Sequence, residues 1–373
     1  MRVLLLSNRY PNPEKPYAAM FVQRHVELHR AMGADIQVLT PNSAPQRQIA
    51  KRIIRQLSFI GRVLWAFLFS DFDVVHAHWP FPAGLLGAVV SIVRRKPLVV
   101  TSHGAMIDDF EQRPWLIQRL VLAVLNHATA VIAVGKQHHN KVRQVTQLPA
   151  DRCFTIPMGV WHSGTLLDRA SARHHLSLPA AERIVIFVGN LEPVKGADIL
   201  LEAIYNIPAD RRNFQLYIGG QGLQRSALEQ WAATHGLADS IHFLGAIPSQ
   251  EVSTWLAAAD LCVVPSRSEA YGLVALEAMA NQTAVLASAV GGLQENIEHG
   301  RTGLLFPCQD VGQLANDIEQ MLNDAALRQR LVQSALHTVQ QHEMQAQAAR
   351  VFNLYTLLLQ SSMKVQVNLS VNK

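Results

Sequence analysis

The chain runs twice through the same pattern, in which short apolar runs rich in β-branched residues alternate with longer stretches of helical periodicity. Hydrophobicity that is continuous within each run predicts strands buried on both faces, and strands separated by helices form parallel sheets through right-handed crossovers. The first series lies at 3–7, 36–40, 73–78, 97–103 and 130–135, and the second at 183–190, 214–220, 241–245, 261–265 and 284–288. The sequence therefore predicts an α/β fold with two doubly wound parallel sheets.

Length and spacing predict two domains. A chain of 373 residues, 49% of them hydrophobic, is too long for one ordinary core and suits two units of Rossmann size. Residues 161–182 are polar and are expected to form a linker, so we place the domains at 1–165 and 166–345. Because parallel strands carry ligand sites at their carboxyl ends, the substrates are expected in a cleft between the two sheets.

Cysteine usage and hydropathy favour a cytoplasmic protein. Cys153, Cys262 and Cys308 are far apart, which indicates neither a disulfide framework nor a zinc knuckle. The strand after Met1 is too short for a signal-peptide core, and no apolar run reaches the roughly 18 residues of a spanning helix. We expect a soluble chain or one bound peripherally to the inner face of the plasma membrane.

The charge is unevenly distributed. Residues 1–165 hold 19 Lys and Arg against 9 Asp and Glu, a net +10, whereas residues 166–373 hold 14 against 19, a net −5. Such an excess predicts an acidic partner for the first half. No nucleic-acid-binding signature accompanies it, so an anionic membrane surface or a phosphate-bearing acceptor is favoured over nucleic acid.

The segment PSRSEAYGLVALE at 265–277 is a loop that leads into an apolar helix. If the helix begins near Gly272, the free amides of Gly272, Leu273 and Val274 form a small anion site suited to a phosphate. Glu277 lies five residues further on, about 7 Å along the axis, where the ribose of a nucleotide would lie. Glu269 precedes the turn and is placed to accept hydrogen bonds from sugar hydroxyls. Taken alone, this spacing also fits a capped core helix with one exposed glutamate.

Further motifs surround this segment. They are VGNLEPVKGADILLEA at 188–203, YIGGQG at 217–222, FLGAIPSQEV at 243–252, AADLCVVPS at 258–266 and GGLQENIEHGRTGLLF at 291–306. In this order they resemble the carboxyl-terminal half of retaining glycosyltransferases of family 4, which have the GT-B fold. The amino half resembles the family more loosely, through MRVLLLSNRYPNP at 1–13, VVHAHWPFPAGLLGA at 74–88 and VVTSHG at 99–104. The final helix, 346–373, is similar to the element that packs back on the first domain in this family.

The resemblance implies an enzyme that moves a hexosyl or N-acetylhexosaminyl group from a nucleoside-diphosphate sugar to a hydroxyl. It places Lys195 on the diphosphate, Glu269 on the sugar hydroxyls and His103 beside the donor sugar, as the catalytic residues. The acceptor class that it implies is a lipid-linked glycan, used in cell-surface polysaccharide synthesis. No cofactor is implied, and no metal is expected, because His76 and His78 share a strand face without a third ligand nearby in the sequence.

The donor-binding residues expected from the motifs belong mostly to loops that follow strands. They are Asn190, Gly220, Gly222, Gly245, Arg267, Tyr271, Gly272, Leu273, Val274 and Glu277. Gly220 and Gly222 also begin a dinucleotide fingerprint, but Arg225 stands where its third glycine belongs, so NAD binding is disfavoured. Neither the sugar nor the base follows from these residues.

The chain departs from the family pattern at several positions. Ala19 replaces a glycine whose positive φ is costly for other residues, and Asn190 replaces an arginine. Met158 replaces an asparagine, while Gln282 and Ala284 replace a glycine and a proline. Two alternatives therefore stay open: a sugar-nucleotide 2-epimerase of the same fold, and a non-catalytic protein that binds glycan or nucleotide.

Residues 46–69 predict an amphipathic helix. Its apolar stripe comprises Ile49, Ile53, Leu57, Ile60 and Leu64, extended by Phe67 and Leu68. Lys51, Arg52, Arg55 and Arg62 supply positive charge, and Trp65 suits a headgroup boundary. The stripe fits either an anionic membrane surface or the core of the first domain, and the charge of this half favours the membrane.

Overall fold

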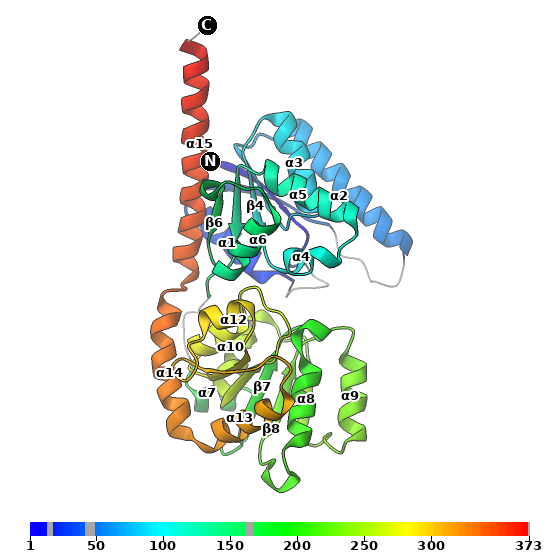
Figure 1. Cartoon of the computed structure of the whole chain (residues 1–373), viewed down its shortest axis with the longest axis vertical. Helices are drawn as coiled ribbons and strands as arrows, with labels where there is room; N and C mark the ends of the chain where they lie inside the picture. The colour runs from blue at the N-terminus through cyan, green and yellow to red at the C-terminus, as the bar shows by residue number, and fades with distance from the viewer. Residues whose placement is uncertain (13–17, 42–48, 161–166, 372–373) are drawn as a thin grey trace. The chain divides into compact units, whose positions relative to one another are not determined.

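The computed structural model describes residues 1–12, 18–41, 49–160 and 167–371, apart from the side chains of residues 49–56, 64, 105 and 361–371. The chain divides into two compact units. Unit 1 comprises Met1–Gly159 and Met344–Lys373, and unit 2 comprises Val160–Glu343. The chain thus leaves unit 1 once and returns to it for its last helix (Figure 1).

Unit 1 is built on a parallel sheet in the order β2-β1-β3-β4-β5-β6. Its strands are β1 (Arg2–Ser7), β2 (Asp35–Leu39), β3 (Val74–His78), β4 (Leu98–Ser102), β5 (Ala130–Ala133) and β6 (Cys153–Thr155). The central strands β3, β4 and β5 are buried at every position, which is why they read as continuous apolar runs in the sequence.

Helices cover both faces of this sheet. They are α1 (Met20–Ala31), α2 (Ile49–Phe69), α3 (Ala83–Arg94), α4 (Ala105–Asp108), α5 (Trp115–His127), α6 (Lys136–Val145) and α15 (Met344–Val371). Helices α2, α3 and α5 lie next to one another and share one apolar core with the sheet, whereas α1 and α15 share a second core with its other face (Figure 1). Two short 3₁₀ turns, η1 (Phe110–Gln112) and η2 (Ala150–Arg152), complete the unit.

Unit 2 repeats the architecture with a parallel sheet in the order β12-β11-β10-β7-β8-β9. Its strands are β7 (Ile184–Val188), β8 (Gln215–Gly219), β9 (Ile241–Gly245), β10 (Leu261–Val264), β11 (Ala284–Ser288) and β12 (Leu304–Phe306). The sheet order reverses direction beside β7, so the loops after β7 and β10 leave neighbouring strands at a topological switch point.

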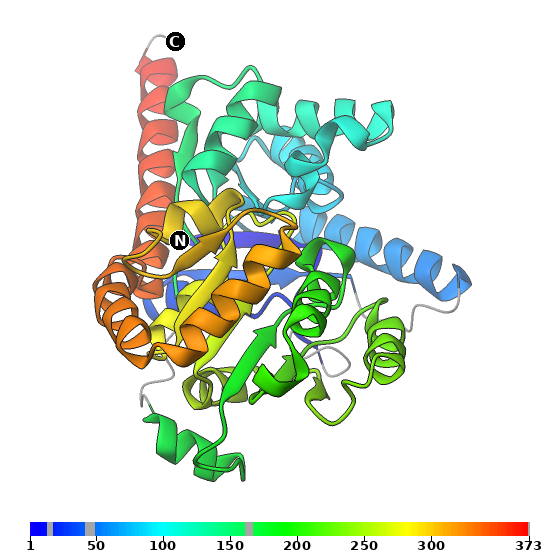
Figure 2. The same ribbon diagram turned by 60° about the horizontal axis from the view of Figure 1, so that its bottom comes forward.

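The helices of unit 2 also cover both faces of its sheet. They are α7 (Arg169–His175), α8 (Ala197–Asn206), α9 (Arg225–Thr234), α10 (Ser249–Ala258), α11 (Leu273–Ala280), α12 (Gly291–Asn296), α13 (Val311–Asn323) and α14 (Ala325–Gln340), with the 3₁₀ turns η3 (Pro193–Lys195) and η4 (Ala209–Arg211). Helices α8 and α13 pack side by side on the sheet (Figure 2). The predicted fold class, with two Rossmann-like parallel sheets, is confirmed.

One local prediction is wrong. The polar stretch expected to be a linker contains helix α7, whose first turn is capped by Asp168 accepting from the amide of Ser171 at 2.8 Å. The helix is held to the sheet by Arg173, which is buried and pairs with Asp260 at 2.9 Å. A buried, paired arginine makes a polar segment part of the core.

Helix α2 faces the core mainly with residues other than the predicted stripe. Phe59, Val63 and Ala66 are buried against the sheet. Of the described members of the stripe, Leu57, Ile60 and Leu68 are exposed, whereas Phe67 is partly buried and packs against the core. Of the predicted basic residues, Arg62 is partly buried and donates to the carbonyl of Thr40. The other predicted side chains lie outside the description: Ile49, Ile53, Leu64, Lys51, Arg52 and Arg55. Most of the described stripe therefore faces away from the core of unit 1.

Two of the positions where the chain departs from the family's glycines keep a glycine-like backbone. Ala19, which precedes α1, has φ 50° and ψ 46°, and Gln282, after α11, has φ 59°. A side chain in this left-handed region places Cβ too close to a carbonyl oxygen, at a cost of about 1–2 kcal/mol. Both positions therefore combine a side chain with a left-handed backbone, which is strained.

We expect Ala19→Gly to raise the free energy of unfolding by about 0.5–1 kcal/mol, since relief of the left-handed strain exceeds the entropy that glycine adds to the unfolded chain. Urea denaturation of the whole chain measures the change. Ala31→Gly, at the exposed last residue of the helix that Ala19 precedes, is the matched control and should not raise stability. If both substitutions lowered stability equally, the strain assigned to Ala19 would be absent.

Candidate functional site

Lys195 and Glu269 meet at the carboxyl edge of the second sheet. Lys195 ends η3, which follows β7, and Glu269 lies in the loop after β10, the strand paired with β7. The lysine Nζ is 2.6 Å from Oε2 of Glu269, and the hydroxyl of Ser266 is 3.4 Å from the same oxygen. Both charged side chains are partly buried, with 30% and 15% of their surface exposed. The structure thus brings together two of the three predicted catalytic residues, in the loops that follow neighbouring strands of one sheet.

Helix α11 begins where the sequence predicted. Gly272 precedes it with φ 80°, a conformation that glycine adopts without strain. The first hydrogen bonds to the carbonyl of Gly272 come from Ala275 and Leu276, so the amides of Gly272, Leu273 and Val274 are outside the helical ladder. Three amides at a helix start, three to five residues after Glu269, can bind a phosphate.

Glu277 lies within α11 and is half-buried. Its charge reaches the neighbouring strand β10: burial, and secondarily Glu277, raises the pKa of Cys262 to about 12. The position is the one predicted for a ribose contact, about 7 Å along the helix from the anion site.

Arg267 has a different set of contacts from those expected of a phosphate ligand. Its guanidinium forms a two-pronged ion pair with Asp198, at 2.9 and 2.7 Å, and donates to the carbonyl of Pro193 at 2.6 Å. Burial alone would raise the pKa of Asp198, but Arg267 outweighs it and the pKa is lowered. Arg267 therefore clamps the turn that carries Lys195 to the loop that carries Glu269, and a phosphate would compete with Asp198 for it.

Glycines allow the loops of this site to pack backbone against backbone. A Cβ at Gly196 would lie 2.0 Å from the carbonyl oxygen of Pro265, and one at Gly220 would lie 1.8 Å from that of Gly189. At Gly222 the nearest atom, the carbonyl oxygen of Leu191, is 2.2 Å away. Gly220 and Gly222, both predicted to bind the donor, must therefore be glycines because of these contacts between loops. This requirement does not depend on any contact with a ligand.

The remaining predicted donor residues differ in exposure. Asn190 is exposed at the end of β7, whereas Tyr271 is buried, with its hydroxyl 2.9 Å from Nδ1 of His342. Gly245, with φ 76°, accepts from the amide of Gly220 at 2.7 Å. Arg225 Nη1 lies 3.0 Å from the place of a Cβ on Gly245. The sequence predicts no role for Arg225, which stands in place of a third glycine, although a cation beside this turn is a candidate ligand for the base or ribose.

His103, the third predicted catalytic residue, follows β4 in unit 1. It belongs to a group of histidines at one end of that sheet, in which its Nε2 is 2.9 Å from Nδ1 of His78. Burial, and next the neighbouring His78, lowers the pKa of His103 well below its usual value. We expect it to be a neutral hydrogen-bonding group at neutral pH.

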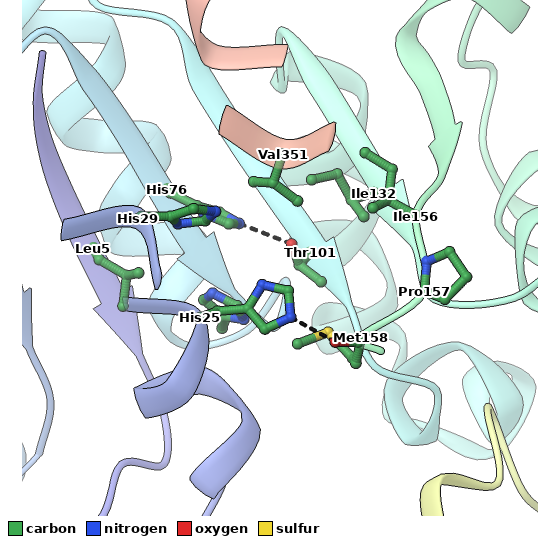
Figure 3. Close-up of a pocket in the computed structure, with 11 residues that line it drawn as sticks. Leu5, His25, His29, His76, Thr101, Ile132, Ile156, Pro157, Met158 and Val351 are labelled. Carbon is green, nitrogen blue, oxygen red and sulfur yellow. Dashed lines mark hydrogen bonds between the residues drawn. The ribbon is translucent and has the colours of Figure 1, made fainter. Parts of the chain in front are cut away.

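A cavity of about 10 Å³, the space of one water-sized sphere, lies among these histidines and the side chains of β1, β5 and α15 (Figure 3). His25 and His29 reach it from α1, His76 and His78 from β3. Each has a hydrogen-bond partner; Nε2 of His25, for example, donates to the carbonyl of Met158 at 2.6 Å. Among the described residues, no group of three or more His, Cys, Asp or Glu side chains could hold a metal ion.

Comparison with known proteins gives the family. The sequence pattern described as Glycosyl transferases group 1 matches residues 168–338, and that described as Glycosyltransferase Family 4 matches residues 18–162. A D-inositol 3-phosphate glycosyltransferase from Thermobispora bispora is 31% identical over 306 residues, which are 78% of this chain and 71% of the relative. An uncharacterized glycosyltransferase from Methanocaldococcus jannaschii is 27% identical over 90% of this chain and 87% of its own length.

Solved structures have the same fold. Sucrose-phosphate synthase from Thermosynechococcus elongatus superposes with a TM-score of 0.82 at 25% identity, covering 97% of this chain and all of that one. HepE from Anabaena, in complex with UDP and glucose, gives 0.77 at 21% identity over 95% and 99%. The chain belongs to glycosyltransferase family 4. It is a glycosyltransferase with a nucleotide-sugar donor, and its identification from the sequence motifs is confirmed.

A substitution that adds one methyl group at Gly196 tests the close contact between Gly196 and Pro265. We expect Gly196→Ala to lower the free energy of unfolding by about 2–3 kcal/mol more than Gly236→Ala, because overpacking adds to the backbone strain. Both glycines have positive φ, 69° and 68°, but Gly236 has open space where a Cβ would stand. Gly196→Ala should also weaken donor binding by calorimetry, because the turn of Lys195 must move. Equal stability of the two variants would show that the loops tolerate the methyl group.

Proposed function

We propose that this enzyme is a retaining glycosyltransferase that moves a hexosyl or N-acetylhexosaminyl group from a nucleoside-diphosphate sugar to a lipid-linked glycan, in the synthesis of a cell-surface polysaccharide. The observation that carries the proposal is the pairing of Lys195 with Glu269 in the loops beside the start of α11. A cation, free helix amides and a hydroxyl-accepting carboxylate are the groups that a sugar diphosphate requires.

Each group has a separate role in the proposed site. The amides of Gly272, Leu273 and Val274 bind the diphosphate, and Lys195 turns from Glu269 to the phosphate that departs. Glu269, released from the lysine, accepts hydrogen bonds from the sugar hydroxyls, and Glu277 accepts from the ribose. HepE, whose structures hold UDP and UDP-glucose, supports a uridine nucleotide as the first donor class to test.

In the proposed transfer, the bond between the anomeric carbon and the phosphate oxygen breaks, and its electron pair goes to the phosphate. The acceptor hydroxyl approaches from the same face, forms the new glycosidic bond and gives its proton to the departing phosphate. Positive charge develops on the sugar ring, where Glu269 and neutral His103 stabilise it. Catalysis of this kind depends on positioning and on fixed charges. Lys195 and the helix start supply the charge that a metal supplies in other phosphate sites.

The relatives named D-inositol 3-phosphate glycosyltransferases make a phosphorylated polyol a second acceptor class to test. We favour a lipid-linked acceptor because of the outer surface of α2, α3 and α5. Most of the large exposed apolar side chains among the described residues lie on these helices. They are Leu57, Ile60, Trp65, Leu68 and Phe69 on α2, Val89, Ile92 and Val93 on α3, and Trp115 and Leu116 on α5, each 37–70% exposed.

This outer surface suits an anionic membrane. Arg95, which follows α3, and Arg119 on α5 are exposed, and the guanidinium of Arg119 lies 5.4 Å from the ring centre of Trp115. Tryptophan and arginine together are typical of the headgroup region, and each basic side chain near an anionic surface contributes about 1 kcal/mol of attraction. No helix in the described part of the chain is long and apolar enough to cross a bilayer. We therefore propose peripheral attachment through α2, α3 and α5.

Donor turnover tests the proposed reaction. Released nucleoside diphosphate is measured with a panel of UDP- and GDP-sugars, with membrane extract or inositol 3-phosphate as acceptor. We expect one donor to be consumed only with acceptor, and Lys195→Ala to lower kcat/KM about a hundredfold or more, as for loss of one fixed charge contact. EDTA should leave the rate unchanged. Turnover without acceptor would indicate an epimerase, and a loss in EDTA that magnesium or manganese restores would refute the metal-free site.

Membrane attachment has a separate test. The protein should sediment with vesicles of anionic phospholipid at low salt, and Trp65→Ser with Phe69→Ser should abolish this binding while circular dichroism shows an intact fold. Leu223→Ser, which removes a 79% exposed apolar side chain from unit 2, is the control and should bind like the parent protein. A parent protein that stays in the supernatant at low salt would refute the attachment.

A further inference from the structure

The hydrogen bond between His78 and His103 joins the ends of two neighbouring strands. His78 is the last residue of β3 and pairs in register with Thr101 of β4, two residues before His103. The bonded nitrogens are 2.9 Å apart, and the two rings are nearly parallel, with centres 5.1 Å apart and an angle of 12° between their planes. A hydrogen-bonded neighbour in this orientation restrains both the position and the rotation of the His103 ring.

His78 can hold His103 because it is itself held. It is 3% exposed, and its ring lies 4.5 Å from that of His76. His76 is fixed at both ring nitrogens: Nε2 is 2.8 Å from the hydroxyl of Thr101, as Figure 3 shows, and Nδ1 is 2.5 Å from that of Tyr355 on α15. Tyr355 of α15 thus holds His76, His76 packs against His78, and His78 holds His103 after the end of β4.

Two aromatic side chains also pack against the ring of His103. The ring of Trp79 lies 4.6 Å from it and that of Phe21 lies 5.1 Å from it, both tilted. With Nε2 engaged by His78 and the ring packed by these two aromatic groups, Nδ1 is the ring nitrogen that has no hydrogen-bond partner among the described residues. Burial lowers the pKa of both histidines, so the pair is neutral and shares hydrogens as two tautomers.

We propose that His78 is a positioning residue for glycosyl transfer: it binds Nε2 of His103, so that Nδ1 is the atom that meets the sugar. This inference rests on the proposed function of His103. The tautomers of the two rings are coupled. When Nδ1 of His78 donates, Nε2 of His103 accepts and Nδ1 of His103 carries the hydrogen; when Nε2 of His103 donates instead, its Nδ1 is an acceptor. A sugar hydroxyl can donate or accept, so either state serves, provided the ring does not turn.

Kinetics separate this role from a structural one. We expect His78→Leu to lower kcat about 10- to 100-fold, as for a catalytic group displaced by about 1 Å, with less than about a threefold change in donor KM. His78→Asn, whose amide occupies the place of Nδ1, should restore kcat to within about threefold of the parent. His29→Leu is the matched control: His29 is 2% exposed in the same cluster and bonds the carbonyl of Ala348, not His103. The His29→Leu variant should lose about as much free energy of unfolding as His78→Leu and keep the kcat of the parent.

A spectroscopic measurement is independent of turnover. In protein labelled with ¹⁵N-histidine, the Nε2 signal of His103 should show a hydrogen bond in the parent and in His78→Asn, and lose it in His78→Leu. Identical His103 signals in all three proteins would overturn the inference, as would a kcat for His78→Leu within about threefold of the parent. If the parent transfers no sugar while the signals behave as expected, the proposed function fails and the positioning of His103 stands.

Discussion

Direct contact of backbone with backbone determines how the loops of unit 2 can be arranged. At Gly196, Gly220 and Gly222 the neighbouring chain lies where a Cβ would be, and at Gly291 the carbonyl of Glu269 occupies that place, 2.0 Å away. The amide of Gly292 donates to the same carbonyl at 2.8 Å. The loops after β7, β8, β10 and β11 therefore form one assembly, in which the position of Lys195 and Glu269 depends on glycines that carry no chemistry themselves.

In unit 1, polar side chains are held within the core itself. Its histidines replace apolar side chains between the sheet and helices α1 and α15, and they are kept neutral by burial. The pKa of His29 is lowered to about 4, first by burial and then by His25. Neutral imidazoles can hydrogen-bond to backbone carbonyls and hydroxyls inside a core without the cost of a buried charge. These buried histidines thus pack like core side chains and also form hydrogen bonds with defined directions.

Most of the fold could be predicted from the sequence because its signals are local. Continuous apolar runs identified the strands, and the glycine at 272 marked the start of α11. The approach of Lys195 to Glu269 also follows, since a parallel sheet places the ends of neighbouring strands together. Helix α7 is not predicted, because its polar composition is typical of a linker, although the sequence does contain the signal of a helix cap at Asp168.

Contacts between side chains distant in sequence could not be predicted. Asp198 and Arg267 are 69 residues apart, and nothing in either motif specifies that they pair. His78 and His103 lie on different strands, and their bond depends on the register of β3 against β4. Helix α2 shows the same limit: two apolar stripes were available, and packing on the sheet selected Phe59, Val63 and Ala66. Register and packing are properties of the assembled domain, which periodicity along one segment does not contain.

The ion pair of Lys195 and Glu269 also balances the charges of the proposed donor site. Each group is the counter-ion of the other, so neither is a lone charge in a partly buried place. A ligand that takes the lysine leaves the carboxylate without a partner, unless the same ligand brings hydroxyl groups to it. A sugar diphosphate provides both halves of this exchange, whereas inorganic phosphate or a free nucleotide provides only the first. In the proposed site, the ion pair would thereby favour a complete donor, which can partner both charges.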